Sequence, residues 1–460
     1  MRWKVLMNQW ESFTTIVFNW VWSPPLLILI SGVGIYLTLV TRGIQFRYLW
    51  YAHRLAFSRH DAQAEGDISH FQALMTALSG TIGIGSITGV ATAIAIGGPG
   101  ALFWMWTAAL LGMATKFGEA ILAIKYRTVD ENGEMCGGPM YYIEKGLNRK
   151  RLGKLFAVFG VITAIAFGNM VQSNSIVLAI EEGWNIDPRW GGAVLTMLVG
   201  VTLVKGIKSI GKVNGVLVPA MAIFYILGGL MILGIHSDKI PAAFSIIFQG
   251  AFHGKAAVGG AMGTSIMTAV QIGVSRSIFS SEAGLGSSPV IAAAAKTDSP
   301  GRQALISMCT VFLTVGIVCT ITGLVVIVSG IVEQADRAKE VFNGSAMMVR
   351  AFDSALPFGS EVVSVALISF GYSTILGWAY CGEKYVEYLF GCRFNQAFRL
   401  LYTLIVIPGS MMSLCLVWNF ASIMNGLMTL PNLIALLALG NVVAKETRFF
   451  DLQRRKEIKK

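Results

Sequence analysis

A run of glycine and hydroxyl residues, Ser79 to Gly89, is the first segment of this sequence whose composition suggests chemistry. Four glycines and four hydroxyl side chains fall within eleven residues of an apolar stretch. Each glycine destabilises a helix by about 1 kcal/mol relative to alanine, so an uninterrupted helix is disfavoured here. Two interpretations fit. The small residues let another helix approach, or the backbone unwinds, so that free N–H groups bind a carboxylate and free C=O groups bind a cation.

A second segment of the same kind spans residues 273–289. Its string Gly-Leu-Gly-Ser at 284–287 is similar to Gly-Ile-Gly-Ser at 83–86, 201 positions earlier. Interrupted helices at corresponding places in two halves of a chain indicate the binding site of a transporter. The pair therefore favours unwinding over simple helix packing.

Four charged residues lie well inside the apolar stretches, away from their ends. Arg276 and Glu282 belong to the second glycine-rich segment, and a charge at membrane depth is usually paired or functional. The alternative is that both lie at the membrane interface and only steady the helix. Lys116 and Glu119 have the spacing of a pair on one helix face, which predicts a structural role.

Two further segments place polar side chains inside apolar stretches. Residues 370–378 contain the adjacent hydroxyls Ser373 and Thr374, followed by Trp378. Hydroxyls of this kind bond the preceding helical turn, or they bind a hard monovalent cation beside a broken helix. Residues 168–175 contain several amides, among them Gln172, which must bond either neighbouring helices or a polar substrate.

The elements that must position these residues follow from the composition. Of 460 residues, 54% are hydrophobic and only 13% are charged, whereas soluble domains carry about 25% charged residues. This excludes a soluble, disordered or coiled-coil protein and predicts an all-α polytopic membrane protein. Eleven apolar stretches are long enough to span a bilayer. They lie near 20–41, 71–97, 101–124, 155–180, 191–206, 213–235, 256–294 (interrupted), 303–331, 358–380, 396–418 and 420–444.

The net charge of +11 predicts the orientation. With the C-terminus inside, 26 of the 36 Lys and Arg residues fall in inside segments and eight in outside segments. The positive-inside rule therefore predicts an outside N-terminus and an inside C-terminus. The basic tail then needs no nucleic-acid partner, and we expect it to contact anionic lipid headgroups.

Several motifs, in order along residues 15–445, resemble the alanine or glycine:cation symporter family. The most specific is GGPGALFWMW, which opens the stretch Gly97–Phe117. The others are Cys136–Tyr142, Ile278–Gly286, and Tyr372–Tyr380 with Gly382 and Glu383.

The resemblance implies a leucine-transporter-type fold of two inverted five-helix repeats, here with one extra N-terminal helix. The segments would be 1–65 (extra helix and basic segment), 66–240 (first repeat), 241–445 (second repeat) and 446–460 (basic tail). It implies a symporter in the cell membrane that imports alanine and glycine with sodium by alternating access. No cofactor besides the coupling ion is expected, no catalysis is expected, and a monomer suffices.

The same resemblance assigns the site residues. Backbone N–H groups at Thr81, Gly83 and Gly85 would bind the substrate carboxylate, and Gln172 would contact the amino acid. The pocket would be lined by Ile278, Phe279, Ser280 and Trp378. Sodium would be held by backbone carbonyls near Ser79 and Ile82 and by Ser373 and Thr374.

Three positions depart from the family pattern. Ser86 stands where Asn is usual, Ile84 where Thr is usual, and Ser281 where Asn usually precedes the glutamate. They bear on the exact substrate and cation, so a proton-coupled transporter of a related small amino acid stays an alternative. An ion channel lined by the glycine segments is an alternative of another class, which the internal two-fold organisation disfavours.

Overall fold

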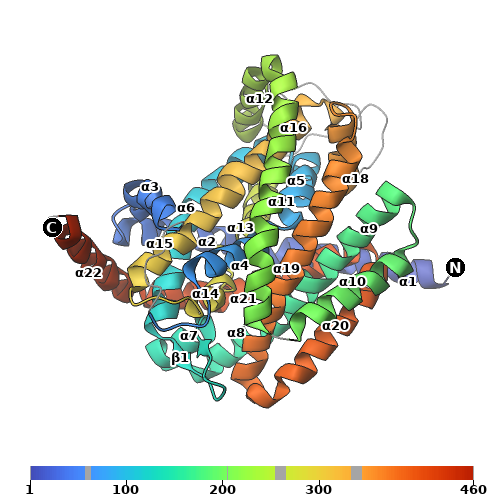
Figure 1. The fold of residues 1–460 in the computed structure, drawn as a ribbon. Coiled ribbons are helices and arrows are strands. Elements are labelled where there is room, and N and C mark those ends of the chain that lie inside the picture. The colour runs from blue at the N-terminus through green and yellow to red at the C-terminus, as the bar shows by residue number, and fades with distance from the viewer. Residues whose placement is uncertain (1, 57–63, 205, 254–265, 333–343, 459–460) are drawn as a thin grey trace.

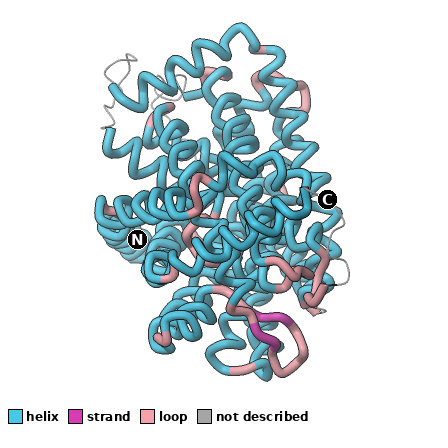
Figure 2. The backbone as a smooth tube through the Cα atoms, turned by 90° about the vertical axis from the view of Figure 1, so that its left-hand side faces the viewer, coloured by secondary structure: helices cyan, strands magenta, loops and turns pink. Residues whose placement is uncertain are grey.

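The computed structural model describes residues 2–56, 64–204, 206–253, 266–332 and 344–458, and these are almost wholly helical (Figures 1 and 2). The first half contains α1 (Arg2–Val21), α2 (Pro24–Val40), α3 (Ile44–Ala56), α4 (His70–Thr81), η1 (Gly85–Gly89), α5 (Val90–Gly97), α6 (Gly100–Lys125), α7 (Pro139–Leu147), α8 (Lys150–Thr163), η2 (Ala164–Val171), α9 (Gln172–Trp184), α10 (Pro188–Leu203) and α11 (Ile207–Ile235).

The second half continues in the same way. It contains η3 (Ser237–Lys239), α12 (Ile240–His253), α13 (Ile266–Ser281), α14 (Ser288–Ala293), α15 (Pro300–Val311), η5 (Phe312–Cys319), α16 (Thr320–Val328), α18 (Gly344–Asp353), α19 (Gly359–Phe390), η6 (Cys392–Phe394), α20 (Asn395–Met411), α21 (Leu414–Ala438) and α22 (Gly440–Ile458). The strands β1 (Thr128–Val129) and β2 (Met135–Cys136) pair antiparallel in a small hairpin, drawn in magenta in Figure 2.

Fewer helices qualify as membrane spans than the eleven that the sequence predicts. Within the described residues six are long and apolar enough, and two bent pairs raise the number to eight. The predicted spans 191–206 and 396–418 correspond to α10 and α20, which have only 16 and 17 residues, and a straight span needs about 20. The predicted span 256–294 lies partly outside the described residues. Eleven spans and the orientation therefore stay predictions.

The N-terminal span differs from the prediction in its boundaries. Helix α1 precedes the predicted stretch 20–41, and α1 and α2 meet at an angle of 43° across Ser23. Pro24 and Pro25 follow the bend, where proline is tolerated at the first helical positions. The indole N–H of Trp22 donates to the Ser422 carbonyl at 3.0 Å. This bond holds the bend against α21.

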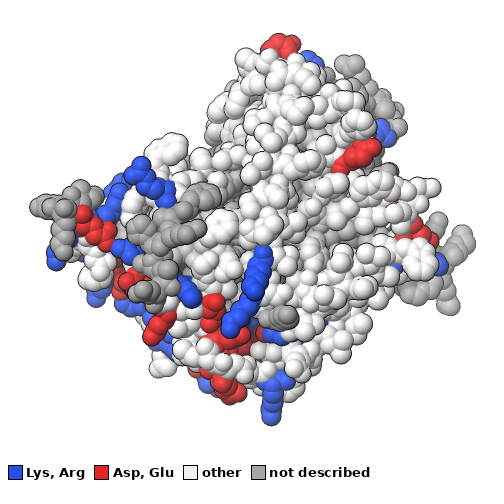
Figure 3. Space-filling model, viewed as in Figure 1, with Lys and Arg blue, Asp and Glu red and all other residues white. Residues whose placement is uncertain are grey.

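Charged side chains gather at the ends of the molecule and leave a broad uncharged surface between them (Figure 3). This is the surface expected of a protein surrounded by lipid. The predicted basic tail is largely helical, as α22. Its Asp451, Glu446 and Glu457 form ion pairs with Arg47, Lys125 and Arg302 respectively. The acidic residues of α22 thus bind this helix to basic residues of α3, α6 and α15.

The first broken helix, formed by α4, η1 and α5, packs against helices on several sides. Helix α4 packs against α11, α15 and α19, and the segment that continues it, η1 and α5, packs against α13, α16 and α18. The second broken helix, α13 and α14, packs against α6. The segments predicted to carry chemistry are therefore all on helices that meet inside the bundle.

Candidate functional site

The first break is real, and it leaves backbone donors free. Helix α4 ends at Thr81, and the chain bends by 47° before η1. The N–H of Ser86 donates to Gly83 O (3.0 Å) and the Ser86 hydroxyl donates to Thr81 O (3.1 Å), which holds the opened turn together. The N–H groups of Gly83 and Ile84 donate to no acceptor among the residues that the structure describes. Two neighbouring free donors can bind an anionic oxygen.

The two glycines of this break permit close approach. A methyl group on Gly83 would lie 2.6 Å from Thr374 Oγ1 and 3.6 Å from Gln172 Oε1. One on Gly85 would lie 2.6 Å from the Phe279 ring and 3.5 Å from Ser280 Oγ. The structure therefore brings these six residues together around the free N–H groups.

Two polar atoms around the break are buried without a partner. Gln172 Oε1 and Ser280 Oγ accept or donate no hydrogen bond within the described part of the chain. Gln172 is held in place through its amide nitrogen, which donates to Phe167 O at 3.1 Å. An unsatisfied buried polar atom destabilises a protein by about 1–3 kcal/mol. Such atoms indicate a place for a polar ligand.

Oxygen atoms cluster beside the same break. Thr374 Oγ1 lies 2.7 Å from Ser79 O and 2.8 Å from Phe370 O. A hydroxyl carries one proton and can satisfy only one of these carbonyls at a time. Ser373 Oγ lies 2.9 Å from Phe370 O and is fully buried, and Ile82 directly follows the last residue of α4. The four predicted sodium residues thus lie on the two facing segments of one small region.

Three predicted residues have other surroundings. The Thr81 hydroxyl accepts a hydrogen bond from Thr314 of η5 at 3.1 Å, so only its backbone faces the break. Ile278 lines a small cavity with residues of α2 and α6, because successive positions of a helix point about 100° apart. Trp378 contacts Phe167 edge to face, with centroids 5.1 Å apart, and Phe167 contacts Phe279 in the same way at 4.4 Å. Phe167 therefore lies between Trp378 and the Phe279 ring at the first break.

The second break, Glu282 to Ser287, is closed by side chains. Glu282, Gly284 and Gly286 all have positive φ. Glu282 accepts hydrogen bonds from Trp378 Nε1 (2.7 Å) and from the Ser287 hydroxyl (2.6 Å). Its carboxylate also lies against Gly80 of α4, where an added methyl group would be 3.0 Å away. The Glu282 side chain thus joins both broken helices to α19.

Lys116 and Glu119 do not bond each other as the spacing predicts. Lys116 Nζ donates to Ser281 O at 2.8 Å, and Glu119 accepts from Asn432 Nδ2 at 2.6 Å. Both side chains are buried. They tie α6 to the second break and to α21, which the sequence spacing within one helix could not reveal.

The three departures from the family pattern have clear surroundings. Ser86 stabilises the opened turn, as described above. Ile84 is fully buried, and a methyl group on Gly371 of α19 would lie 2.9 Å from its Cδ1. The Ser281 hydroxyl accepts a hydrogen bond from the Ala283 N–H at 3.3 Å. None of the three side chains extends the set of groups around Gly83.

Asn214 is a residue that the sequence analysis missed. Its amide nitrogen donates to Ser79 Oγ at 2.9 Å, and Ser79 Oγ in turn lies 2.8 Å from Thr76 O. Asn214 thereby fixes the end of α4 whose carbonyl faces Thr374. A lone amide in the apolar stretch 213–235 is the signal that could have indicated it.

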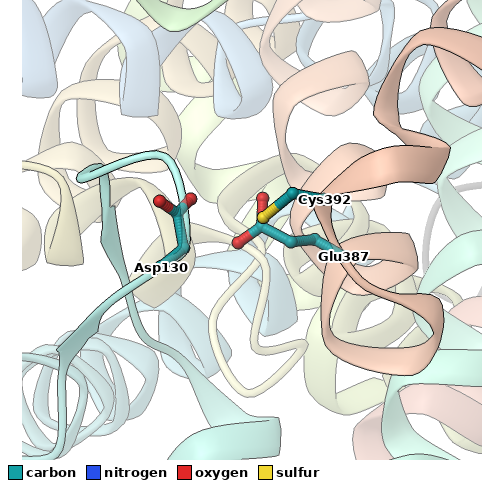
Figure 4. A group of neighbouring side chains, drawn as sticks. All are labelled: Asp130, Glu387 and Cys392. Carbon is teal, nitrogen blue, oxygen red and sulfur yellow. The ribbon is translucent and has the colours of Figure 1, made fainter.

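A separate acidic group lies at the hairpin, away from this site. Asp130, Glu387 and Cys392 face one another there (Figure 4). Lys384 Nζ already forms ion pairs with Asp130 (2.8 Å) and Glu387 (3.0 Å). Burial raises the pKa of the Asp130 carboxyl, but hydrogen bonds from Lys384 and from the Glu134 N–H outweigh burial and hold this pKa below its ordinary value. The group joins the hairpin to the end of α19.

Comparison with known proteins agrees with this architecture. The sequence model of the sodium:alanine symporter family matches residues 7–460. The sodium/alanine symporter AgcS of Methanococcus maripaludis is 51% identical over 453 residues, which are 97% of this chain and 99% of that protein. An uncharacterized transporter of Haemophilus influenzae is 47% identical over 441 residues, 95% of each chain.

A solved structure gives the fold. The crystal structure of MhsT in complex with L-phenylalanine matches with a TM-score of 0.58, at 14% identity, over 84% of this chain and 97% of that one. At this identity the likeness concerns the fold alone. The fold resembles that of leucine-transporter-type proteins, as the motifs predict.

Proposed function

The chain belongs to the sodium:alanine symporter family, and from this premise we propose that it imports alanine and glycine across the cell membrane together with sodium. As a member it is a multi-pass membrane transporter and not an enzyme. The observation that carries the proposal is the pair of free N–H groups at Gly83 and Ile84, together with the unpartnered Gln172 Oε1, which lies 3.6 Å from where a methyl group on Gly83 would be.

These groups suit a small zwitterion. The free N–H groups would bind the carboxylate, and Gln172 Oε1 would accept from the ammonium group. The Phe279 ring packs against the Gly85 backbone beside them, because a methyl group on Gly85 would lie 2.6 Å from that ring. A short side chain is therefore favoured, which supports alanine and glycine over larger amino acids.

The oxygen cluster suits a hard monovalent cation. Ser79 O and Phe370 O are carbonyl oxygens, and Thr374 and Ser373 offer hydroxyl oxygens from α19. Sodium would bind here together with the Ile82 carbonyl. Because a cation would hold α4 against α19, it would fix the opened turn that binds the amino acid. The two ligands would then bind cooperatively.

Coupling to sodium gives the driving force. One charge that crosses a potential of 100 mV contributes about 2.3 kcal/mol, which corresponds to roughly fifty-fold accumulation. The chemical gradient of sodium adds to this. The cycle would alternate between states in which the site, now closed to solvent, opens to either side.

Uptake of labelled alanine into proteoliposomes tests the proposal. We expect an inward sodium gradient to drive uptake that unlabelled alanine and glycine compete away, and an equal potassium gradient to fail. Equal uptake with both gradients would contradict sodium coupling. Uptake that follows an inward proton gradient and ignores sodium would instead favour the proton-coupled alternative.

A further inference from the structure

Arg276 is a buried cation without a counter-ion. Only 9% of its surface is exposed, and its Nε is buried without a hydrogen-bond partner in the described part of the chain. No carboxylate of a described residue lies within ion-pair distance of it. An uncompensated charge in the interior is strongly destabilising and marks a functional group when it is retained.

Aromatic rings hold the guanidinium in place. Its central carbon lies 4.8 Å from the centroid of the Trp418 ring and 5.6 Å from that of Phe279. The two rings are stacked, with centroids 4.8 Å apart and an angle of 7° between their planes. Cation–π contacts orient a guanidinium but leave its N–H groups free for an anion.

The guanidinium lies close to the first break. A methyl group on Gly89 would be 4.0 Å from Arg276 Cδ and 3.9 Å from the Trp418 ring. Gly89 is one helical turn beyond Gly85 in η1. Phe279, the ring beneath the guanidinium, also contacts the Gly85 backbone. Phe279 thus connects the surroundings of Arg276 with those of the free N–H groups.

We propose that Arg276 forms an outer carboxylate subsite, which pairs with the carboxylate of the amino acid on its way to or from the N–H groups of Gly83 and Ile84. This proposal rests on the proposed function and adds a residue that determines specificity. The planar guanidinium matches a carboxylate with two parallel hydrogen bonds. Its positive charge also disfavours cationic amino acids, because a second positive charge would be brought beside it at low dielectric.

A role in packing alone would leave a different signature. If Arg276 only joined α13 to α21 through Trp418, its loss would lower the amount of active protein and affect all ligands alike. A carboxylate subsite predicts a selective change. The affinity for alanine weakens, competition by lysine strengthens, and the affinity for sodium stays the same.

The test compares Arg276→Gln with the wild-type protein in proteoliposomes. We expect the KM for alanine to rise about tenfold or more, since hydrogen bonds to charged groups are among the strongest in proteins. The sodium concentration for half-maximal uptake should stay within about twofold, as it does for a change far from the cation. Arg189→Gln, which removes an exposed arginine of α10, is the matched control and should change neither value.

Arg276→Lys serves if the glutamine variant does not fold. It keeps the charge but loses the planar fork, so we expect a several-fold rise in the KM for alanine while lysine stays excluded. An unchanged KM for alanine in the folded Arg276→Gln variant would overturn the proposed subsite. If only Arg276→Lys folds, an unchanged KM in that variant would overturn it. Failure of the proposed function would show in the wild-type protein itself, as uptake that is absent or independent of sodium.

Discussion

The two broken helices contain similar strings, but the backbone groups that each break frees have different partners and surroundings. At the first break the N–H groups of Gly83 and Ile84 have no acceptor among the described residues. At the second break the N–H of Gly286 likewise has no acceptor among the described residues, but two carbonyls are bonded by side chains of other helices, since Lys116 donates to Ser281 O and Asn432 donates to Gly284 O. The breaks therefore differ in their surroundings: the unpartnered Gln172 Oε1 and Ser280 Oγ lie beside Gly83 and Gly85, whereas side chains tie the second break to α6 and α21.

Glycine serves a different purpose in each break. Gly284 and Gly286 have φ of +88° and +87°, a conformation that other residues adopt only with strain. Gly83 and Gly85 are not in that region, and their lack of a side chain lets Thr374 and Phe279 approach. Substitutions at the first break should therefore affect ligands, and those at the second should affect folding.

The largest expected effect is at Gly83. In Gly83→Val the added side chain would collide with Thr374 Oγ1, which a methyl group would already meet at 2.6 Å. We expect alanine uptake to fall at least about a hundredfold, since misplaced binding groups have effects of that size, while the protein stays monodisperse. Normal uptake by this variant would place the binding site elsewhere.

The next effect is at Lys116, and it is one of stability. Lys116→Met removes the donor to Ser281 O and the cation that interacts with both Glu119 and Glu282. Breaking a buried charge network destabilises a protein by about 3 kcal/mol or more, so the apparent melting temperature in detergent should fall. Lys116→Arg is the matched control, with a smaller loss expected. A melting temperature equal to that of the wild type would contradict the anchor.

Thr374→Ala should separate the two ligands. It removes one oxygen from the proposed cation site, while the free N–H groups of Gly83 and Ile84 remain. We expect the sodium concentration for half-maximal uptake to rise about tenfold, and the KM for alanine at saturating sodium to rise by less. Thr374→Ser, which keeps the hydroxyl, should restore sodium affinity. Unchanged sodium dependence in Thr374→Ala would refute this assignment.

The smallest effect is at Gly284, which sharpens the contrast with Gly83. In Gly284→Ala the new side chain adopts a left-handed conformation, which destabilises by about 1–2 kcal/mol. The KM for alanine in the folded protein should not change, because the residue lies at the closed break. A selective loss of alanine affinity without loss of stability would mean that both breaks bind the substrate.

The sequence predicted both breaks because glycine and hydroxyl content is a local property. It also predicted the neighbourhood of Gly83, Gln172 and Thr374 through the family motifs. It could not predict contacts set by packing between distant helices. The bond from Lys116 to Ser281, the direction in which Ile278 points, and the role of Asn214 all depend on which helix lies opposite, and no spacing along one helix contains that information.

The apolar pattern of the sequence also could not predict the lengths of all the helices. Apolar composition alone suggested eleven spans, but α20 has 17 residues and is shorter than the apolar stretch 396–418 that predicted it, and α10 has only 16 residues. At the end of α20, Pro408 and the start of α21 at Leu414 set the limit.

The central claim is that sodium and alanine bind to the same opened turn and stabilise each other there. Titration of the purified protein with each ligand, in the absence and presence of the other, tests it most directly. Sodium should tighten alanine binding, and alanine should tighten sodium binding by the same factor, because the coupling of two binding equilibria is reciprocal. Alanine binding with equal affinity in sodium and in potassium would contradict the account.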